Sequence, residues 1–206
     1  IYSDNFDTNF YNNHGVVGLI NTPTARFHNE GVHGVTFYDG TPDQKITLSS
    51  SPYDWLEASF FYTNIQGQKY CSADYDPVCN QDNNDKGFNF KLRVKEEGAL
   101  PTIAIGINDI AGTGFYSSEY IVGSYGINNI DFHFGLSWGN LNGSKHSFKN
   151  PFGKISSQFY NRPATFETNG GQFQPSRYFS GNKTSPFLGI SYSLNKKVLI
   201  KLETDN

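Results

Sequence analysis

The sequence lacks any apolar run of about 18 residues, which is the length that a membrane-spanning helix requires. Helices are disfavoured more generally, because no long stretch keeps its apolar positions at the three-and-four spacing of a helix face. An excess of positive charge is also missing: 16 basic and 19 acidic residues give a formal net charge of −3. That balance argues against nucleic acid as a partner, because phosphate binding relies on basic side chains.

Aromatic residues and glycine are, by contrast, abundant. Aromatic residues make up 16% of the chain, with 18 Phe and 13 Tyr, and there are 21 Gly, although only 36% of the residues are hydrophobic. Disordered chains are poor in aromatic residues, so the composition argues against disorder. It predicts β-structure in which one face of the sheet does not pack into a dry core.

Apolar and polar residues alternate along much of the chain, which is the pattern of a β-strand with two unlike faces. In residues 130–139 every even-numbered residue is large and apolar, and in residues 88–95 the polar side carries three cations. Similar patterns predict strands at residues 34–40, 45–51, 56–64, 103–108, 119–126, 188–193 and 198–205, and a tenth strand is placed at residues 15–22.

Every second connection between the nine main strands is tight. The tight connections are residues 52–55, 97–101, 127–129 and 194–197, whereas those at 65–87 and 140–185 are very long. Short turns on one rim and long loops on the other are typical of outer-membrane barrels, and strict alternation is not expected of a soluble sandwich. The sequence therefore predicts an all-β fold: an antiparallel transmembrane β-barrel, or the N-terminal part of one, with short periplasmic turns and long extracellular loops.

The two faces of the strands support the same choice. Periodicity alone does not separate a barrel from a sandwich, but polar faces rich in Gly, Ser and charge suit a wet lumen. Aromatic residues near segment ends suit the headgroup girdles of a barrel: Tyr53, Trp55, Tyr62 and Trp138. We therefore expect these apolar side chains to face lipid: Phe88, Phe90, Leu92, Ile103, Ile105, Phe132, Phe134 and Leu136.

The polar faces supply the candidate functional residues. Three cations of one strand would give a pore wall positive charge, balanced by Glu57, Asp131 and Glu203. In one interpretation these groups form ion pairs that hold the lumen together. In the other they offer a passage or docking surface to an acidic sugar polymer, because carboxylates favour Arg and Lys partners. The candidate lumen-facing residues are Lys91, Arg93, Lys95, Asp131, His133, Lys201 and Glu203.

Signals of catalysis and metal binding are weak. A Ser–His–Asp hydrolase needs its groups close together, but Ser137 lies roughly 13 Å from His133 at strand rise, although both share one face. The acidic stretch at residues 82–87 resembles half an EF-hand, but Lys86 occupies a ligand position and the downstream Glu is missing. We expect no enzyme activity, no metal and no cofactor.

The two cysteines, Cys71 and Cys79, lie in a polar stretch that contains no His. Their spacing does not fit a zinc site. A local disulfide bond is favoured over two free thiols, and it would imply an oxidising compartment.

Several short segments, taken in chain order, resemble proteins of the YjbH/GfcD type. The likeness is carried by residues 18–26 (GLINTPTAR), 52–58 (PYDWLEA), 91–93 (KLR), 96–97 (EE), 111–115 (AGTGF), 117–120 (SSEY), 135–139 (GLSWG) and 201–203 (KLE). Proteins of this family look like outer-membrane β-barrels encoded with exopolysaccharide or group 4 capsule genes. The resemblance implies a bacterial outer-membrane location and a role in the secretion or assembly of an extracellular polysaccharide.

These expectations also define boundaries and partners. Residues 1–14 are expected to form an N-terminal extension, and residues 15–206 the strands of an incomplete barrel that continues beyond residue 206. Nine strands leave an edge that must pair in lipid with the tenth strand, with further strands of the same protein or with another subunit. The expected partners are outer-membrane lipid, a polysaccharide and periplasmic export proteins, without nucleic acid. The alternative function is a general porin or structural barrel subunit with no polymer role.

Overall fold

The computed structural model describes residues 9–70, 81–141, 143, 145–164, 173–195 and 197–204. In these residues the main elements are strands β1 (Val32–Asp39), β2 (Asp43–Tyr53), β3 (Leu56–Lys69), β4 (Asp82–Lys95), β5 (Thr102–Ile110), β6 (Ser118–Ile127), β7 (Ile130–Gly139), β9 (Lys183–Asn195) and β10 (Val198–Thr204). The long β7–β9 connection adds the short strand β8 (Phe148–Lys149) and three 3-10 helices, η1 (Pro151–Lys154), η2 (Ser157–Tyr160) and η3 (Pro175–Arg177). No helix among the described residues has the length and apolar character needed to cross a membrane.

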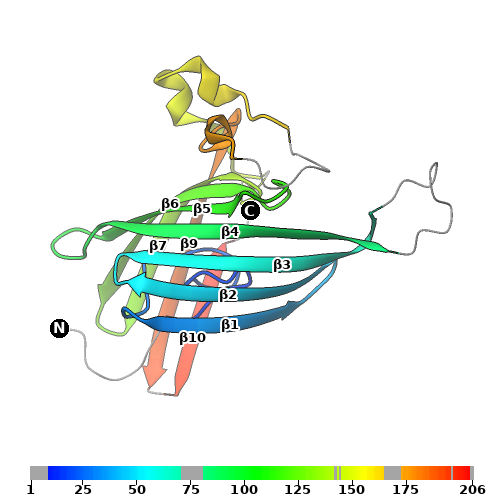
Figure 1. Ribbon diagram of the computed structural model, residues 1–206. Coiled ribbons are helices and arrows are strands. Elements are labelled where there is room, and N and C mark those ends of the chain that lie inside the picture. The colour runs from blue at the N-terminus through cyan, green and yellow to red at the C-terminus, as the bar shows by residue number, and fades with distance from the viewer. Residues whose placement is uncertain are drawn as a thin grey trace.

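The strands form one antiparallel sheet in the order β1-β2-β3-β4-β5-β6-β7-β9-β10, with β8 paired to β9 beside this path. Figure 1 shows that the sheet curls, so that β7, β9 and β10 cross behind β1 to β4. Among the described residues β1 and β10 are the two ends of the sheet and do not pair with each other. The nine predicted strands and their antiparallel order are confirmed, and together they form a half-barrel.

The two faces of the sheet differ as the alternation predicted. Residues paired across strands share a face, so Phe90, which pairs with Ala58 and Ile107, lies on the same side as they do. This outer face exposes large apolar side chains from eight strands: Val35, Phe37, Ile46, Leu48, Tyr62, Phe88, Phe90, Leu92, Val94, Ile127, Ile130, Phe132, Phe134, Leu188, Ile190, Tyr192, Leu194, Val198, Ile200 and Leu202. Three other side chains expected to point outward do so but are half-buried among their neighbours: Ile103, Ile105 and Leu136.

From β2 onward the connections follow the predicted alternation. Those after β2, β4, β6 and β9 are short, whereas β3–β4, β5–β6 and β7–β9 are joined by longer segments. The first connection, between β1 and β2, is also short and comprises residues 40–42. Tyr53 and Trp55 stack at the β2–β3 turn with ring centres 5.3 Å apart and stay about half exposed. The expectation for Trp138 was wrong: it is fully buried, because the long β7–β9 connection folds over it and stacks Phe152 against its ring at 5.3 Å.

Residues 9–31, called the inner segment below, lie across the concave face of the sheet and not within it. The predicted strand at residues 15–22 is wrong, since this stretch makes only two isolated bridges, Tyr11↔Val17 and Gly18↔Pro23. The backbone groups of this stretch form hydrogen bonds within turns and with side chains of the sheet, and not with a neighbouring strand. The fit is close, because a Cβ on Gly189 of β9 would lie 2.0 Å from Leu19 Cδ1. The inner segment therefore fills the interior of the half-barrel, and the domain boundary expected at residue 14 stays a prediction.

Candidate functional site

A buried ion pair joins β3 to β4 beneath the inner segment. Lys91 Nζ lies 3.1 Å from Glu57 Oε2, and both side chains are fully buried. The same ammonium group donates to the backbone carbonyls of Val17 at 3.1 Å and Arg26 at 2.8 Å, and Glu57 Oε1 accepts from the Val17 N–H at 2.8 Å. A buried pair is tolerated when further hydrogen bonds satisfy both charges. The inner segment provides those bonds, so Lys91 and Glu57 attach it to the sheet.

Arg26 of the inner segment makes a two-pronged contact with β7. Its Nε and Nη2 donate to the two carboxylate oxygens of Asp131 at 2.7 and 2.6 Å. Its Nη1 lies 2.5 Å from Glu97 Oε2. Bidentate guanidinium–carboxylate pairs are strong and directional. Sequence reasoning placed Asp131 in the lumen but missed Arg26 as its partner, because the two residues are 105 positions apart.

His133 lies between serine hydroxyls of two neighbouring strands. Its Nδ1 is 2.8 Å from Ser124 Oγ and its Nε2 is 3.1 Å from Ser191 Oγ, while Asp131 Oδ2 lies 3.7 Å from Nε2. The group resembles a Ser–His–Asp triad, but Ser124 is fully buried and accepts a hydrogen bond from the Ala25 N–H at 2.9 Å. A covered hydroxyl does not reach a substrate, so the arrangement favours anchoring of the inner segment over nucleophilic catalysis.

Strand β10 holds a turn of the inner segment. The Glu203 carboxylate accepts hydrogen bonds from three consecutive backbone N–H groups, those of residues 20–22, at 2.8 to 3.1 Å, and from the Thr22 hydroxyl at 2.8 Å. Lys201 Nζ donates to the carbonyls of residues 18 and 19 at 2.8 and 3.1 Å. Glu203 and Lys201, which alternate with apolar residues in β10, thus bind the N–H groups and the carbonyl groups of the turn, respectively.

Replacing Glu203 with Ala is expected to loosen this turn. Three N–H groups lose a charged acceptor, and a hydrogen bond to a charged group contributes about 1.5–3 kcal/mol. The Asn21 amide should therefore exchange its hydrogen at least about tenfold faster in hydrogen–deuterium exchange. Glu96→Ala, which removes an exposed glutamate from the β4–β5 turn, is the matched control and should leave this amide unchanged. An unchanged exchange rate at Asn21 in Glu203→Ala would show that the carboxylate does not hold the turn.

Arg93 and Lys95, the other two cations of β4, are more exposed than Lys91 and lie closer to the β4–β5 turn. The Arg93 guanidinium lies 4.8 Å from the centre of the Phe27 ring and 3.8 Å from the carboxylates of Asp54 and Glu96. Lys95, at the last position of β4, is exposed. All the predicted lumen-facing residues except Lys95 thus contact the inner segment or the side chains that anchor it. These contacts fit the interpretation in which the polar groups hold the lumen together.

His14 of the inner segment lies beside β4. The His14 carbonyl accepts a hydrogen bond from Asn89 Nδ2 at 3.2 Å. Burial of the imidazole, followed by the nearby positive charge of Lys45, lowers the pKa of His14 well below its ordinary value. His14 is therefore neutral at physiological pH and adds no positive charge to the interior.

The acidic stretch that resembles half an EF-hand does not gather around one point. Asp82 pairs with Lys69 at 2.8 Å, whereas Asp85 is buried and accepts hydrogen bonds from two backbone N–H groups. The described part of the chain contains no group of three or more His, Cys, Asp or Glu side chains that could hold a metal ion. Cys71 and Cys79, the expected disulfide, lie outside the described residues.

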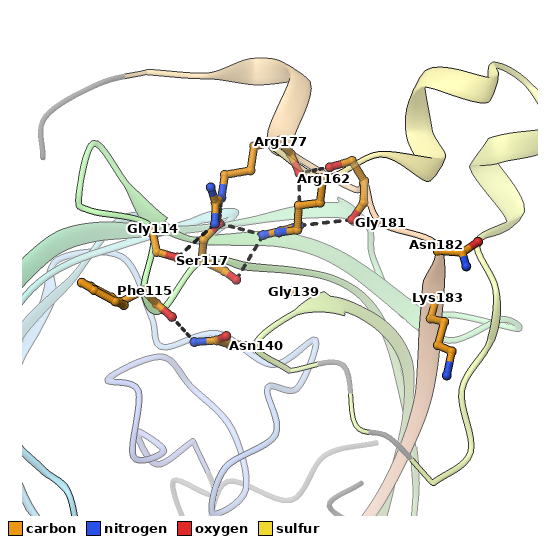
Figure 2. A pocket seen from close by; sticks show the side chains of 11 residues that line it. Gly114, Phe115, Ser117, Gly139, Asn140, Arg162, Arg177, Gly181, Asn182 and Lys183 are labelled. Atoms are coloured by element: carbon orange, nitrogen blue, oxygen red, sulfur yellow. Dashed lines mark hydrogen bonds between the residues drawn. The ribbon is translucent and has the colours of Figure 1, made fainter. Parts of the chain in front are cut away.

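A second polar cluster lies at the loop rim of the sheet, where the β5–β6 and β7–β9 connections meet (Figure 2). Arg162 donates to both carboxylate oxygens of the fully buried Glu119 at 2.7 and 2.9 Å. Arg177 donates to Ser117 Oγ at 3.2 Å and to three backbone carbonyls at 2.6 to 3.2 Å. Burial, and then the neighbouring Arg162, lower the pKa of Arg177. Sequence reasoning missed this cluster, because 43 residues separate Arg162 from Glu119 and no periodicity marks the loop.

Together these features define a class of protein: an antiparallel half-barrel with an apolar exterior, whose polar interior is filled by its own N-terminal segment. The chain belongs to the YjbH family, since the family model described as "Exopolysaccharide biosynthesis protein YbjH" matches residues 10–206. It is 35% identical over 191 residues to the uncharacterized lipoprotein YjbH of Escherichia coli (strain K12). That match covers 92% of this chain and 27% of the relative, so the chain spans about a quarter of the relative's length. No solved structure matches the chain.

Proposed function

We propose that this chain is part of an outer-membrane β-barrel protein that acts, without catalysis, in the secretion or assembly of an exopolysaccharide or capsule. The observation that carries the proposal is the apolar outer face of the sheet in a member of an exopolysaccharide biosynthesis family. The lipoprotein name of the Escherichia coli relative is consistent with a membrane-associated envelope protein.

The outer face supports contact with lipid. Its side chains include Phe37 at 80% exposure, Leu202 at 64% and Val94 at 62%, and it extends over neighbouring strands without a polar interruption at its centre. Soluble monomeric proteins rarely expose contiguous apolar patches larger than about a few hundred Å². Such a face can contact lipid tails directly, provided that every backbone group is hydrogen-bonded within the sheet.

The two ends of the sheet support a longer barrel. In lipid an unpaired strand edge leaves backbone groups without partners, and each such group costs several kcal/mol. We propose that strands from the rest of the protein pair with β1 and β10, since the chain corresponds to about a quarter of its relative. The short turns would then face the periplasm and the long connections, including the Arg162–Arg177 cluster, the exterior.

The filled interior bears on the kind of passage that the barrel provides. A general porin needs an open aqueous channel, whereas here the inner segment is held to β3, β4 and β7 by buried charges and to β10 by the half-buried Glu203. This favours a component of polymer secretion over a diffusion porin. In planar bilayers the purified full-length protein should show little steady conductance, and a large open-channel conductance would favour the porin alternative.

A deletion strain tests the proposed function. In a Gram-negative host that carries the gene, the full-length protein should fractionate with the outer membrane. Loss of the gene should leave polysaccharide within the cell envelope and lower the amount at the surface, and the intact gene should restore it. Recovery of the protein in the soluble periplasm, or unchanged surface polysaccharide in the deletion strain, would contradict the proposal.

A further inference from the structure

The loop rim contains a pocket of about 430 Å³. It lies between the β5–β6 connection, the end of β7 and the start of β9 (Figure 2). Arg162, Arg177 and Lys183 line it together with Asn140 and Asn182. Pockets that bind small ligands have volumes of about 300–1,000 Å³, so this one has room for a sugar-sized group. The charged side chains of its described lining are all cationic.

One cation of the pocket, Arg177, lacks a carboxylate partner among the described residues. Arg162, Arg177 and Lys183 line the pocket, and its described lining contains no carboxylate. Glu119 lies beneath the pocket and is paired with Arg162. Arg177 has no carboxylate within ion-pair distance in the described part of the chain, although Glu119 and Asp109 act on it electrostatically. The wall thus keeps a positive charge that a ligand could neutralise.

Both guanidinium groups are fixed in place and still have donor capacity. Five N–H groups belong to each arginine. Arg177 Nη2 makes one hydrogen bond, to Gly114 O at 3.2 Å, and Arg162 Nε makes none within the described residues. Glycine permits this arrangement at the end of β7, because a Cβ on Gly139 would lie 2.6 Å from Arg162 Nη2. Donors that are already held in position lose little conformational entropy when a ligand binds.

We propose that this pocket binds a carboxylate-bearing sugar unit, such as a uronic acid residue of the exported polymer. Planar guanidinium groups recognise carboxylates well, and the asparagine amides suit the donors and acceptors of sugar hydroxyls. The inference rests on the proposed function, which brings a polysaccharide to this rim. It adds that the polymer is acidic and that the β5–β6 and β7–β9 connections contact it.

Binding of defined oligosaccharides to the full-length protein in detergent tests the site. The probes are a glucuronate-containing oligosaccharide, the same compound with its carboxyl groups reduced to alcohols, and inorganic phosphate. The acidic probe should bind with an affinity that falls as salt rises, and the reduced probe at least about tenfold more weakly. Equal binding of both oligosaccharides would overturn the proposal. So would a site that phosphate blocks at the same concentration as the acidic probe, because phosphate would then be its ligand.

Variants locate the site on the protein. Arg177→Gln removes a buried anchor of the loop and affects folding as well as charge. Lys183→Gln changes an exposed residue of the lining, and it should weaken binding of the acidic probe by about three- to tenfold while the protein remains folded. Lys154→Gln is the matched control, since it removes the same charge from an exposed position of η1 outside the pocket. Equal loss of affinity in both lysine variants, or in neither, would place binding elsewhere. If the intact gene restores surface polysaccharide to the deletion strain but the protein binds none of the probes, this inference alone is contradicted and the proposed function stands.

Discussion

Replacing Lys91 with Met is expected to release part of the inner segment. The substitution leaves the Glu57 carboxylate buried without its counter-charge, and it removes the donor to the carbonyls of Val17 and Arg26. Breaking a buried ion pair by removing one partner costs about 3–5 kcal/mol. The free energy of opening at the Val17 amide, which donates to Glu57, should fall by an amount of that order in hydrogen–deuterium exchange.

Two further variants separate charge from packing. Lys95→Met removes a cation from the exposed end of the same strand face, and it should change stability by less than about 0.5 kcal/mol. Adding Glu57→Gln to Lys91→Met removes the uncompensated charge, so the double variant should recover part of the loss. If Lys91→Met were no more disruptive than Lys95→Met, the buried pair would not be what attaches the inner segment to the sheet.

The second large effect is expected at Phe134, in the middle of β7. This side chain is 45% exposed on the outer face, beside Leu188 of β9. In a lipid environment Phe134→Lys would place a charge among acyl chains, and such a change near the bilayer midplane costs about 2–4 kcal/mol. The free energy of folding into lipid vesicles should fall accordingly.

A lysine at Leu100 provides the control for this experiment. Leu100 is 61% exposed but lies in the β4–β5 turn, beyond the sheet. Leu100→Lys should therefore cost less than about 1 kcal/mol, as charges near the interface do. Equal costs at Phe134 and Leu100 would mean that the outer face meets water or another protein and not the bilayer interior.

The strands could be predicted from the sequence because their information is local. Along Ile130–Gly139 the polarity of each residue indicates the face of the sheet on which it lies. The short turns determine which strands are neighbours. Lys91, Asp131 and Glu203 were assigned to the inner face by the same alternation, and in the structure each of them contacts the inner segment.

The interior and the loop rim could not be predicted, because their contacts join distant parts of the chain. Residues 20–22 are bound by Glu203, more than 180 positions away, and their own sequence resembles a weak strand. Trp138 continues the apolar alternation of β7, so nothing local distinguishes a buried ring from an exposed one. The polar, Pro-containing stretch Asn21–Arg26, which ends in a cation, was the one available sign that this segment departs from the ladder pattern.

The proposed contact of the outer face with lipid is tested most directly by spin labels placed one at a time at residues 130–136 of the full-length protein in lipid vesicles. Each label is measured for its accessibility to oxygen, which concentrates in the bilayer, and to a water-soluble nickel complex. We predict that labels at 130, 132, 134 and 136 are accessible to oxygen and protected from nickel, and that labels at 131, 133 and 135 are shielded from oxygen by the sheet and the inner segment. Oxygen accessibility that does not alternate, or nickel accessibility at residues 132 and 134, would contradict the account of this chain as a wall of a membrane barrel.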